Sequence, residues 1–317
     1  MKKYLCLLFV IIFSCNNHDE NKIAIVIHGG AGIILKENIS KSKEDSIINK
    51  LDEAISKGWE LLKKGESSEI AVIETIKILE DSPLFNAGKG SVFNSEGKVE
   101  NDASIMKGND LNAGASSGTS NVKNPITLAA NIMNHSEHVF LSGKGAENFA
   151  KNRNLEIVNN EYFHTKFRYN QLLNKKGEDK YGTVGCVAID VNGNIVAGTS
   201  TGGMTNKKWG RIGDSPIIGA GTYANNSTCG ISSTGSGEYF IRTVAAYQVS
   251  SLLENHNYDL KKAMYKVIHE KIGGIGGDGG MIGIDKNSNI SMEFNTPGMY
   301  RAYVNKYGEK EIFLYEE

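Results

Sequence analysis

Thr183 is the residue of this sequence whose neighbours could turn it into a nucleophile. It follows Gly182 in the run "YGTVGCVAID", residues 181–190, where a long polar stretch gives way to apolar residues. A threonine hydroxyl is a weak nucleophile unless a base lies beside it, and its own α-amine can be that base if Thr183 is the first residue of a chain. Cleavage after Gly182 would free that amine, and glycine tolerates the strained backbone of such a step. The plainer interpretation is a strand former behind a glycine.

A second hydroxyl, that of Thr201, is predicted to lie beside Thr183. The two residues belong to apolar runs on either side of "DVNGN", which is typical of a hairpin with a three-residue loop, 191–193, ending in a left-handed glycine. Such a loop pairs Asp190 with Asn194 and, further along the strands, Thr183 with Thr201 on one face of the sheet. A two-residue Asn-Gly turn would shift the register and place Thr201 on the other face. A purely structural Thr–Thr pair is the alternative.

Arg211 and Asp214, in the glycine-bounded run "GRIGDSP", are suited to the two charged groups of an amino acid. A guanidinium binds a carboxylate through two parallel hydrogen bonds, and an aspartate binds an ammonium group. The structural alternative is a surface ion pair, which is common for such residues. The run "STGSGE", residues 233–238, precedes a predicted helix. Its backbone N–H groups and the Thr234 hydroxyl could therefore stabilise an oxyanion.

Blocks of helices and strands joined by hairpins must position these residues. Apolar spacing predicts helices over 46–64, from Ser67 or Ser68 to about Leu79, from Pro125, over "GAENFAKN", from Gly237 as one long helix, and over about 259–272. Strands are predicted at 23–27, "VFLSG", 183–190, 195–201, "MIGID", "ISMEF" and, as the last, near "MYRAYV". Residues 151–182 show little periodicity and are predicted to be a loop that could accommodate processing. This order favours an α+β fold over a doubly wound parallel sheet.

The first residues are typical of an export signal. A basic start, "MKKY", precedes the apolar run "LCLLFVIIF", which is too short to span a bilayer as a mature helix. The run leads to "IFSC", which is similar to the lipobox of bacterial lipoproteins and ends in Cys15, the residue that would be lipidated. We therefore expect residues 1–14 to be a signal peptide and the protein to be exported, as a periplasmic or outer-membrane lipoprotein. A plain secretory signal is the alternative.

The composition and the weaker motifs exclude several classes of protein. The 317 residues are 40% hydrophobic with a formal net charge of −1, which fits one large or two smaller domains and indicates no nucleic-acid partner. "HGGAG" lacks the GxGxxG spacing and "GGIGGDGG" lacks the Lys-Ser/Thr of a P-loop, so nucleotide binding is disfavoured. His135 and His138 have no third ligand nearby in sequence and are expected to be solvated. Cys186 and Cys229 could pair, although buried free thiols fit their context equally well.

Several motifs occur together in the order and with the spacing of one known family. Over about residues 23–304 the chain resembles the isoaspartyl peptidase/L-asparaginase family, the plant-type asparaginases, through "IHGGAG", "PLFNAGKGSVF", "GTVG", "TSTGGMTNK", "GRIGDSP", "GAGTYANN", "STGSGE" and "FNTPGMYRA". The resemblance implies an N-terminal nucleophile hydrolase with a four-layer αββα sandwich. It also implies self-cleavage into an α subunit, residues 15–182, and a β subunit, residues 183–317. Both would form one catalytic domain and assemble as a dimer of heterodimers, (αβ)2.

The resemblance also implies roles for individual residues. Thr183 would be the nucleophile freed by cleavage of Gly182–Thr183, Thr201 the assisting hydroxyl, and Asn86 a residue near the active site. Thr234 and Gly235 would form the oxyanion hole. The substrate-binding residues would be Arg211, Ile212, Gly213, Asp214, Thr234, Gly235, Ser236 and Gly237. No cofactor or metal is expected in catalysis, but backbone carbonyls of the loop from Leu79 to Lys89 would hold the family's structural sodium ion.

The implied activity is hydrolysis of isoaspartyl (β-aspartyl) peptides and L-asparagine with release of L-aspartate. Both substrates present the same aspartyl end, so the motifs leave their order open. Glycosylasparaginases are the alternative within the family, but they typically have Asp where this chain has Gly182. Outside enzymes, the alternative is an uncleaved lipoprotein that binds amino acids or peptides in the same pocket. Mere binding would need neither Thr183, Thr201 nor Thr234.

Overall fold

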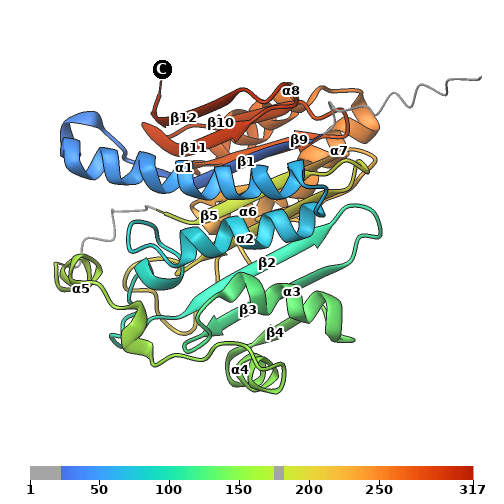
Figure 1. The fold of residues 1–317 in the computed structure, drawn as a ribbon. Helices are drawn as coiled ribbons and strands as arrows, with labels where there is room; N and C mark the ends of the chain where they lie inside the picture. The colour runs from blue at the N-terminus through green and yellow to red at the C-terminus, as the bar shows by residue number, and fades with distance from the viewer. Residues whose placement is uncertain (1–22, 175–181, 317) are drawn as a thin grey trace, which may run out of the picture.

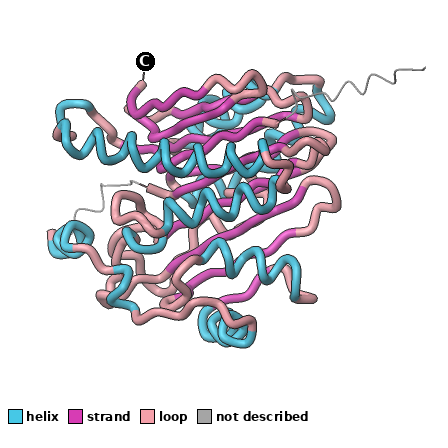
Figure 2. Tube along the Cα trace, viewed as in Figure 1, coloured by secondary structure: helices cyan, strands magenta, loops and turns pink. Residues whose placement is uncertain are grey.

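The computed structural model describes residues 23–174 and 182–316. The predicted signal segment with Cys15 and the residues directly before Gly182 lie outside these ranges. The described chain combines two sheets with helices, so the predicted α+β class is confirmed (Figures 1 and 2). Within the described ranges, none of the helices has both the length and the apolar character that a membrane span requires.

The larger sheet contains the strands on either side of the predicted nucleophile. Within the described residues it has eight strands in the order β12-β11-β1-β5-β6-β2-β3-β4, antiparallel except between β3 and β4. The bounds are β1 Ala24–Gly32, β2 Asn101–Lys107, β3 Ala113–Thr119, β4 Phe140–Ser142, β5 Val184–Ile189, β6 Ile195–Thr201, β11 Gly298–Val304 and β12 Lys310–Tyr315. The smaller sheet, in the order β10-β9-β8-β7, consists of β7 Thr222–Ala224, β8 Cys229–Gly235, β9 Gly279–Asp285 and β10 Ile290–Phe294.

Three helices lie across one face of the larger sheet: α1 Lys41–Lys63, α2 Ser68–Glu80 and α3 Pro125–His135 (Figure 1). Ser40 and Ser67 cap the first two, because each hydroxyl accepts a hydrogen bond from a first-turn N–H group. Pro125 occupies the first turn of the third, where its missing N–H group costs nothing. The short helix α4, Gly143–Asn152, packs beside α3.

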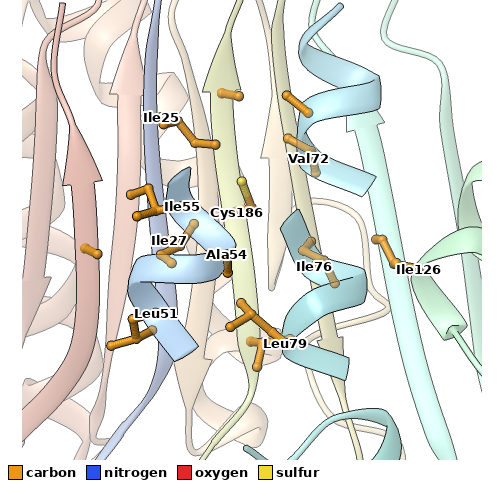
Figure 3. Close-up of a cluster of buried hydrophobic side chains, with 14 of the residues drawn as sticks. Ile25, Ile27, Leu51, Ala54, Ile55, Val72, Ile76, Leu79, Ile126 and Cys186 are labelled. Carbon is orange, nitrogen blue, oxygen red and sulfur yellow. The ribbon is translucent and has the colours of Figure 1, made fainter. Parts of the chain in front are cut away.

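β1 is buried along its whole length, on both of its faces. Successive side chains of a strand point to opposite faces. Ile25 and Ile27 therefore pack under the helices with residues such as Leu51 (Figure 3). Ala24 and Val26 instead contact residues of β9 in the smaller sheet. The two sheets thus share a hydrophobic interface, and the site described below lies at one end of it.

The far face of the smaller sheet is covered by helices from the C-terminal part of the chain. These are α6 Gly237–Thr243, α7 Ala245–His256, and α8 Leu260–Tyr265 with the π-helical turns Lys266–Ile272 that continue it. The helix predicted over about 259–272 is thereby confirmed. α6 begins directly after the end of β8, so the run "STGSGE" spans a strand-to-helix junction.

The long helix predicted after "STGSGE" is in fact two helices. Val244 adopts a left-handed backbone conformation, with φ of 49°, between α6 and α7. The N–H groups of Ala246 and Tyr247 donate to the carbonyl groups of Ala220 and Gly219. Contacts with a segment remote in sequence therefore satisfy the free N–H groups at the start of α7. Apolar spacing continues through the break and gives no sign of it.

Two further predictions were wrong. The stretch 151–182, predicted to lack structure, contains the helix α5, Lys166–Leu173. Thr165 caps this helix, and the buried Arg168 ties it to the domain by donating from Nε to the carbonyl group of Gly90 at 2.8 Å. The strand near "MYRAYV" is not the last, because β12 follows it at the edge of the larger sheet.

Candidate active site

Thr183 and Thr201 face each other at the ends of β5 and β6. The predicted three-residue hairpin is present: Asp190 and Asn194 pair across it, and Gly193 has φ of 77°. The register of the two strands follows, with Val184 opposite Ser200. The Oγ1 atoms of Thr183 and Thr201 lie 3.0 Å apart. The predicted register, and with it the contact between the two hydroxyls, is confirmed.

The backbone around Gly182 is confined from two sides. Gly182 has φ of +116°, a conformation that L side chains rarely adopt. A Cβ at this position would lie 2.5 Å from the backbone nitrogen of Asn86, and one at Gly30 would clash with the backbone of Gly182 itself. The carbonyl oxygen of Gly182 accepts a hydrogen bond of 2.8 Å from the N–H group of Asn86. The bond before Thr183 is therefore held in an unusual conformation with its carbonyl group polarised.

Asn86 connects this junction to the loop that follows β6. Its side-chain Nδ2 donates to the carbonyl group of Gly203 at 2.7 Å, and its Oδ1 accepts from the N–H group of Val92 at 2.9 Å. Its own carbonyl group accepts from Gly202 at 2.9 Å. The amide therefore fixes the distance between the two segments that flank Thr183 and Thr201.

A pocket opens above the two threonines. Its lining consists of Asn86, Gly182, Thr183, Thr201, Gly203, Met204, Thr205, Arg211, Gly213, Asp214, Ser215, Thr234, Gly235 and Ser236. Most of the residues predicted for the site therefore come together here from segments distant in sequence. Two do not line it: Ile212 is 39% exposed, and Gly237 lies behind Asp214, where a Cβ would be 2.8 Å from Oδ1.

Arg211 and Asp214 present opposite charges in this pocket. Arg211 donates from Nε and Nη2 to the two carboxylate oxygens of Glu238, each at 2.9 Å. This pair holds one edge of the guanidinium, and Nη1 faces Gly213. Sequence reasoning did not single out Glu238, although it ends the run "STGSGE". Apart from its charge, which could pair with that of Arg211, nothing in the sequence indicates that Glu238 orients the guanidinium.

Asp214 is almost entirely buried, and its Oδ2 has no hydrogen-bond partner within the described residues. Burial raises the pKa of its carboxyl group from 3.8 to about 7, an effect that the nearby Arg211 opposes. A ligand with a positive charge would supply the missing partner and stabilise the carboxylate. The acid thus has the surroundings expected for a group that binds an ammonium ion.

Thr234 and Gly235 line the pocket from the end of β8. Gly235 has φ of +150°, and a Cβ there would lie 2.5 Å from the carbonyl oxygen of Asp278. The Thr234 hydroxyl accepts a long hydrogen bond of 3.4 Å from the N–H group of Ala31. The hydroxyl proton of Thr234 is thereby left for another acceptor, as a hydrogen-bond donor to a ligand oxygen requires.

His28 is a second residue of the site, after Glu238, that sequence reasoning missed. It is fully buried beneath Thr183, with Nδ1 2.9 Å from the Thr183 carbonyl oxygen and Nε2 3.0 Å from Oγ of Ser232. Burial lowers the pKa of its imidazole to about 3, although the hydrogen bond to Thr183 acts in the opposite direction. The ring is therefore neutral in the folded protein at ordinary pH. A lone histidine within a strand carries no pattern that would have revealed these contacts.

The other candidate sites of the sequence behave as follows. His135 and His138 are exposed, as expected. Cys186 and Cys229 are free and buried, and burial raises the pKa of both thiols. Among the described residues no cluster of His, Cys, Asp or Glu side chains could hold a metal ion.

The loop from Leu79 to Lys89 folds back tightly on itself. A Cβ at Gly88 would clash with the carbonyl oxygen of Glu80, and one at Gly90 would clash with that of Phe85. A backbone carbonyl oxygen thus packs against each of these two positions, where only glycine leaves room. This chemistry fits a cation with oxygen ligands.

The fold and the pocket define an α+β protein in which a threonine pair lines a pocket together with a basic and an acidic side chain. Residues 21–314 match the family model described as "Asparaginase". A putative isoaspartyl peptidase/L-asparaginase of Dictyostelium discoideum is 45% identical over 327 residues, with 90% of this chain and 94% of the relative covered. An isoaspartyl peptidase of Escherichia coli (strain K12) is 46% identical over 297 residues, with 89% and 92% covered. A plant-type L-asparaginase of Pyrococcus furiosus is 41% identical over 310 residues, with 91% and 98% covered. The chain belongs to this asparaginase family.

Proposed function

We propose that this protein is a self-activating amidohydrolase that releases L-aspartate from isoaspartyl peptides and from L-asparagine. The observation that carries the proposal is the contact between the Thr183 and Thr201 hydroxyls at the base of a pocket that also contains Arg211 and Asp214. The printed names of the relatives, isoaspartyl peptidase and L-asparaginase, support it.

Activation begins with attack of Thr183 Oγ1 on the carbonyl carbon of Gly182. The bond from that carbon to the Thr183 nitrogen breaks, the nitrogen takes the hydroxyl proton, and an ester joins the two residues. Water then hydrolyses the ester, which leaves a carboxylate on Gly182 and a free α-amine on Thr183. The Asn86 N–H group, 2.8 Å from the Gly182 carbonyl oxygen, stabilises the negative charge that develops there. The products are an α subunit, residues 15–182, and a β subunit, residues 183–317.

Turnover uses the same hydroxyl with its new base. The α-amine of Thr183 takes the Oγ1 proton as the oxygen attacks the side-chain carbonyl carbon of the aspartyl group, and it returns the proton to the leaving amine. The Thr201 hydroxyl donates to the attacking oxygen. The Thr234 hydroxyl and the Gly235 N–H group stabilise the oxyanion. Water then cleaves the acyl-enzyme and releases L-aspartate.

The two charged residues hold the substrate's α-amino acid end. Asp214 binds the ammonium group, and the edge of Arg211 that Glu238 leaves open binds the α-carboxylate. Gly213 and Ser236 line the space between them. Ile212 and Gly237 do not line the pocket but lie next to Arg211 and Glu238 in sequence. The clamp recognises an L-aspartyl end whatever amine the side chain carries.

The wider organisation is proposed on the same basis. The three interlayer cores support the four-layer αββα sandwich of N-terminal nucleophile hydrolases. Assembly as (αβ)2 rests on the resemblance to the family. The apolar run before Cys15, which precedes the family match at residue 21, supports export as a periplasmic or outer-membrane lipoprotein with a lipid anchor. The carbonyl oxygens around Gly88 and Gly90 support a structural sodium ion with no part in the chemistry.

The test begins with the chain itself. Denaturing electrophoresis and N-terminal sequencing of the purified protein should give two fragments, one of which begins at Thr183. The Thr183→Ala variant should stay in one piece and be inactive, and a variant that still splits there would overturn the mechanism. Rates on L-asparagine, an isoaspartyl dipeptide and a glycosylated asparagine then define the substrate. A preference for the glycosylated compound would favour glycosylasparaginase, and L-aspartate binding by an intact chain without turnover would favour a binding protein.

A further inference from the structure

A buried chain of hydrogen-bonding groups leads from the proposed nucleophile into the space between the two sheets. It starts at the carbonyl oxygen of Thr183, 2.9 Å from Nδ1 of His28. Nε2 of the same ring lies 3.0 Å from Oγ of Ser232, and that oxygen lies 2.7 Å from Oγ1 of Thr199. The chain therefore passes from β5 to β1, then to β8 in the smaller sheet, and back to β6.

The chain continues to the loop that carries the substrate clamp. Oγ1 of Thr199 lies 2.6 Å from Oγ1 of Thr222, which lies 2.8 Å from Oγ of Ser104. Ser104 donates to the carbonyl oxygen of Ser215 at 2.6 Å. Ser215 directly follows Asp214, and both line the pocket. We call the four hydroxyl residues Ser232, Thr199, Thr222 and Ser104 the hydroxyl relay.

The protons near the two ends of this chain can be assigned, although its four hydroxyl protons are one fewer than the five contacts that the hydroxyls make. Both terminal atoms, the carbonyl oxygens of Thr183 and Ser215, can only accept hydrogen bonds. His28 must therefore carry its proton on Nδ1, and because the ring is neutral, Nε2 must accept from Ser232. Ser232 in turn has only its lone pairs left for Thr199. The carbonyl group of Thr183 therefore determines which atom donates in each hydrogen bond near His28.

Burying the hydroxyl relay would destabilise the fold if its side chains lacked hydrogen-bond partners. His28 and all four relay residues are fully buried between sheets that also share apolar contacts, and burial of polar groups is tolerated only when they are hydrogen-bonded. β5 also makes room for it: Gly185 pairs with His28, and a Cβ there would clash with Nε2 of His28 and Oγ of Ser232. Because Gly185, the second glycine of "GTVG", has no side chain, the His28 ring can reach Ser232 in the smaller sheet.

We propose that His28 is a positioning residue for Thr183, and that the hydroxyl relay sets the position of the nucleophile relative to the Asp214–Ser215 segment. This inference rests on the proposed function. His28 touches no reacting atom. It holds the carbonyl group of the residue whose hydroxyl and amine react, while the other end of the relay holds the segment that binds the substrate's ammonium group.

Two substitutions at His28 test its hydrogen-bond donor, Nδ1, separately from its hydrogen-bond acceptor, Nε2. An asparagine amide can occupy the position of Nδ1 and donate to Thr183, whereas a glutamine amide reaches the position of Nε2 and retains the contact with Ser232. With an isoaspartyl dipeptide as substrate and rates divided by the cleaved fraction, His28→Gln should lower kcat about tenfold, as expected for one lost buried hydrogen bond. Its KM should change little. His28→Asn should retain most of kcat.

Substitutions in the relay test its other end. Thr222→Val should raise KM more than it lowers kcat, because it loosens Ser215, and Thr199→Val should change both. Thr228→Val is the matched control: Thr228 is also buried and contacts another hydroxyl, that of Ser250, at 2.6 Å. Thr228→Val should lower the melting temperature by an amount similar to that of the two relay variants, and it should leave kcat and KM unchanged.

The outcomes separate this inference from the proposed function. An inactive wild-type protein would refute the function. An active wild type in which His28→Asn and His28→Gln lose equal activity, or in which Thr199→Val matches Thr228→Val, would refute the positioning role alone. If the His28 variants do not fold, the comparison of Thr199→Val with Thr228→Val decides the question.

Discussion

The preference for ligands with an amino group should disappear as the pH falls through about 7. Burial raises the pKa of the Asp214 carboxyl group to about 7, with Arg211 acting against burial and Glu238 acting with it. Only the carboxylate form attracts an ammonium group. The binding-competent form of the free protein is therefore populated above this pH and lost below it.

The size of the effect follows from the ionised fraction. With a pKa of about 7, roughly a tenth of the free protein carries the carboxylate at pH 6. The apparent dissociation constant of a ligand that needs it then rises about tenfold at pH 6 relative to its value above pH 8. Binding of the ammonium group lowers the pKa of Asp214, so a proton should be released when the ligand binds at pH 6.

A pair of inhibitors isolates this group. L-aspartate and succinate share two carboxylates and differ only in the α-amino group that Asp214 should hold. The α-amine of Thr183 also titrates near this pH, but it affects both inhibitors and cancels in the ratio of their inhibition constants. The preference for L-aspartate should rise with pH around a midpoint near 7. Asp214→Asn should abolish the preference at every pH.

Two results would refute the reasoning. A preference that stays flat from pH 5 to 9 would mean that Asp214 does not hold the amino group. A midpoint near 4 would mean that the carboxyl group is better solvated than its burial in the structure indicates.

Three further predictions concern the junction, the core and the threonine pair. Gly30→Ala should leave most of the chain uncut on denaturing gels, because its Cβ would clash with Gly182, whereas Gly65→Ala, at a similar positive φ but in open space, should split normally. Glu80 is fully buried and burial raises its pKa from 4.5 to about 8, so the stability it contributes is fully present below 4.5 and is lost as the pH rises through 8. Glu80→Gln should remove this pH dependence, and at pH 9 its free energy of unfolding should exceed that of the wild type by up to about 5 kcal/mol. Urea unfolding of an uncut variant measures this free energy. Parallel curves of unfolding free energy against pH would contradict the prediction. Thr201→Val should lower kcat by up to roughly a hundredfold at unchanged KM, because the attacking oxygen loses the hydrogen bond that the Thr201 hydroxyl donates; an unchanged kcat would exclude the hydroxyl from the reaction.

The sequence was most informative where a single local feature determines a long-range arrangement. One turn, with Gly193 in the left-handed conformation, determines the pairing of every residue along β5 and β6. The contact between Thr183 and Thr201 could therefore be predicted from loop length alone. The start of α2 was predictable for the same reason, because its serine cap lies within one turn, whereas α1 begins at Lys41, five residues before its predicted start.

Features that depend on contacts between distant segments could not be predicted. The break at Val244 exists because the start of α7 bonds to residues 219 and 220. α5 has no apolar face for a pattern to reveal: Phe167 and Leu173 are more than half exposed, and the helix is held by the buried Arg168. His28 acquires its role only when β8 brings Ser232 to it from another sheet.

The strand order of the larger sheet affects how the protein would unfold and refold once the Gly182–Thr183 bond is cut. Strands from either side of the Gly182–Thr183 bond alternate in blocks: β11 and β12, then β1, then β5 and β6, then β2, β3 and β4. A cut at that bond therefore yields two polypeptides woven into one sheet, with β1 inserted between two strands of the other fragment. Before the cut, folding is a unimolecular event; after it, refolding would require two chains to meet and interleave. The mature protein would then persist because it unfolds slowly, and its durability would be a matter of rate rather than of equilibrium.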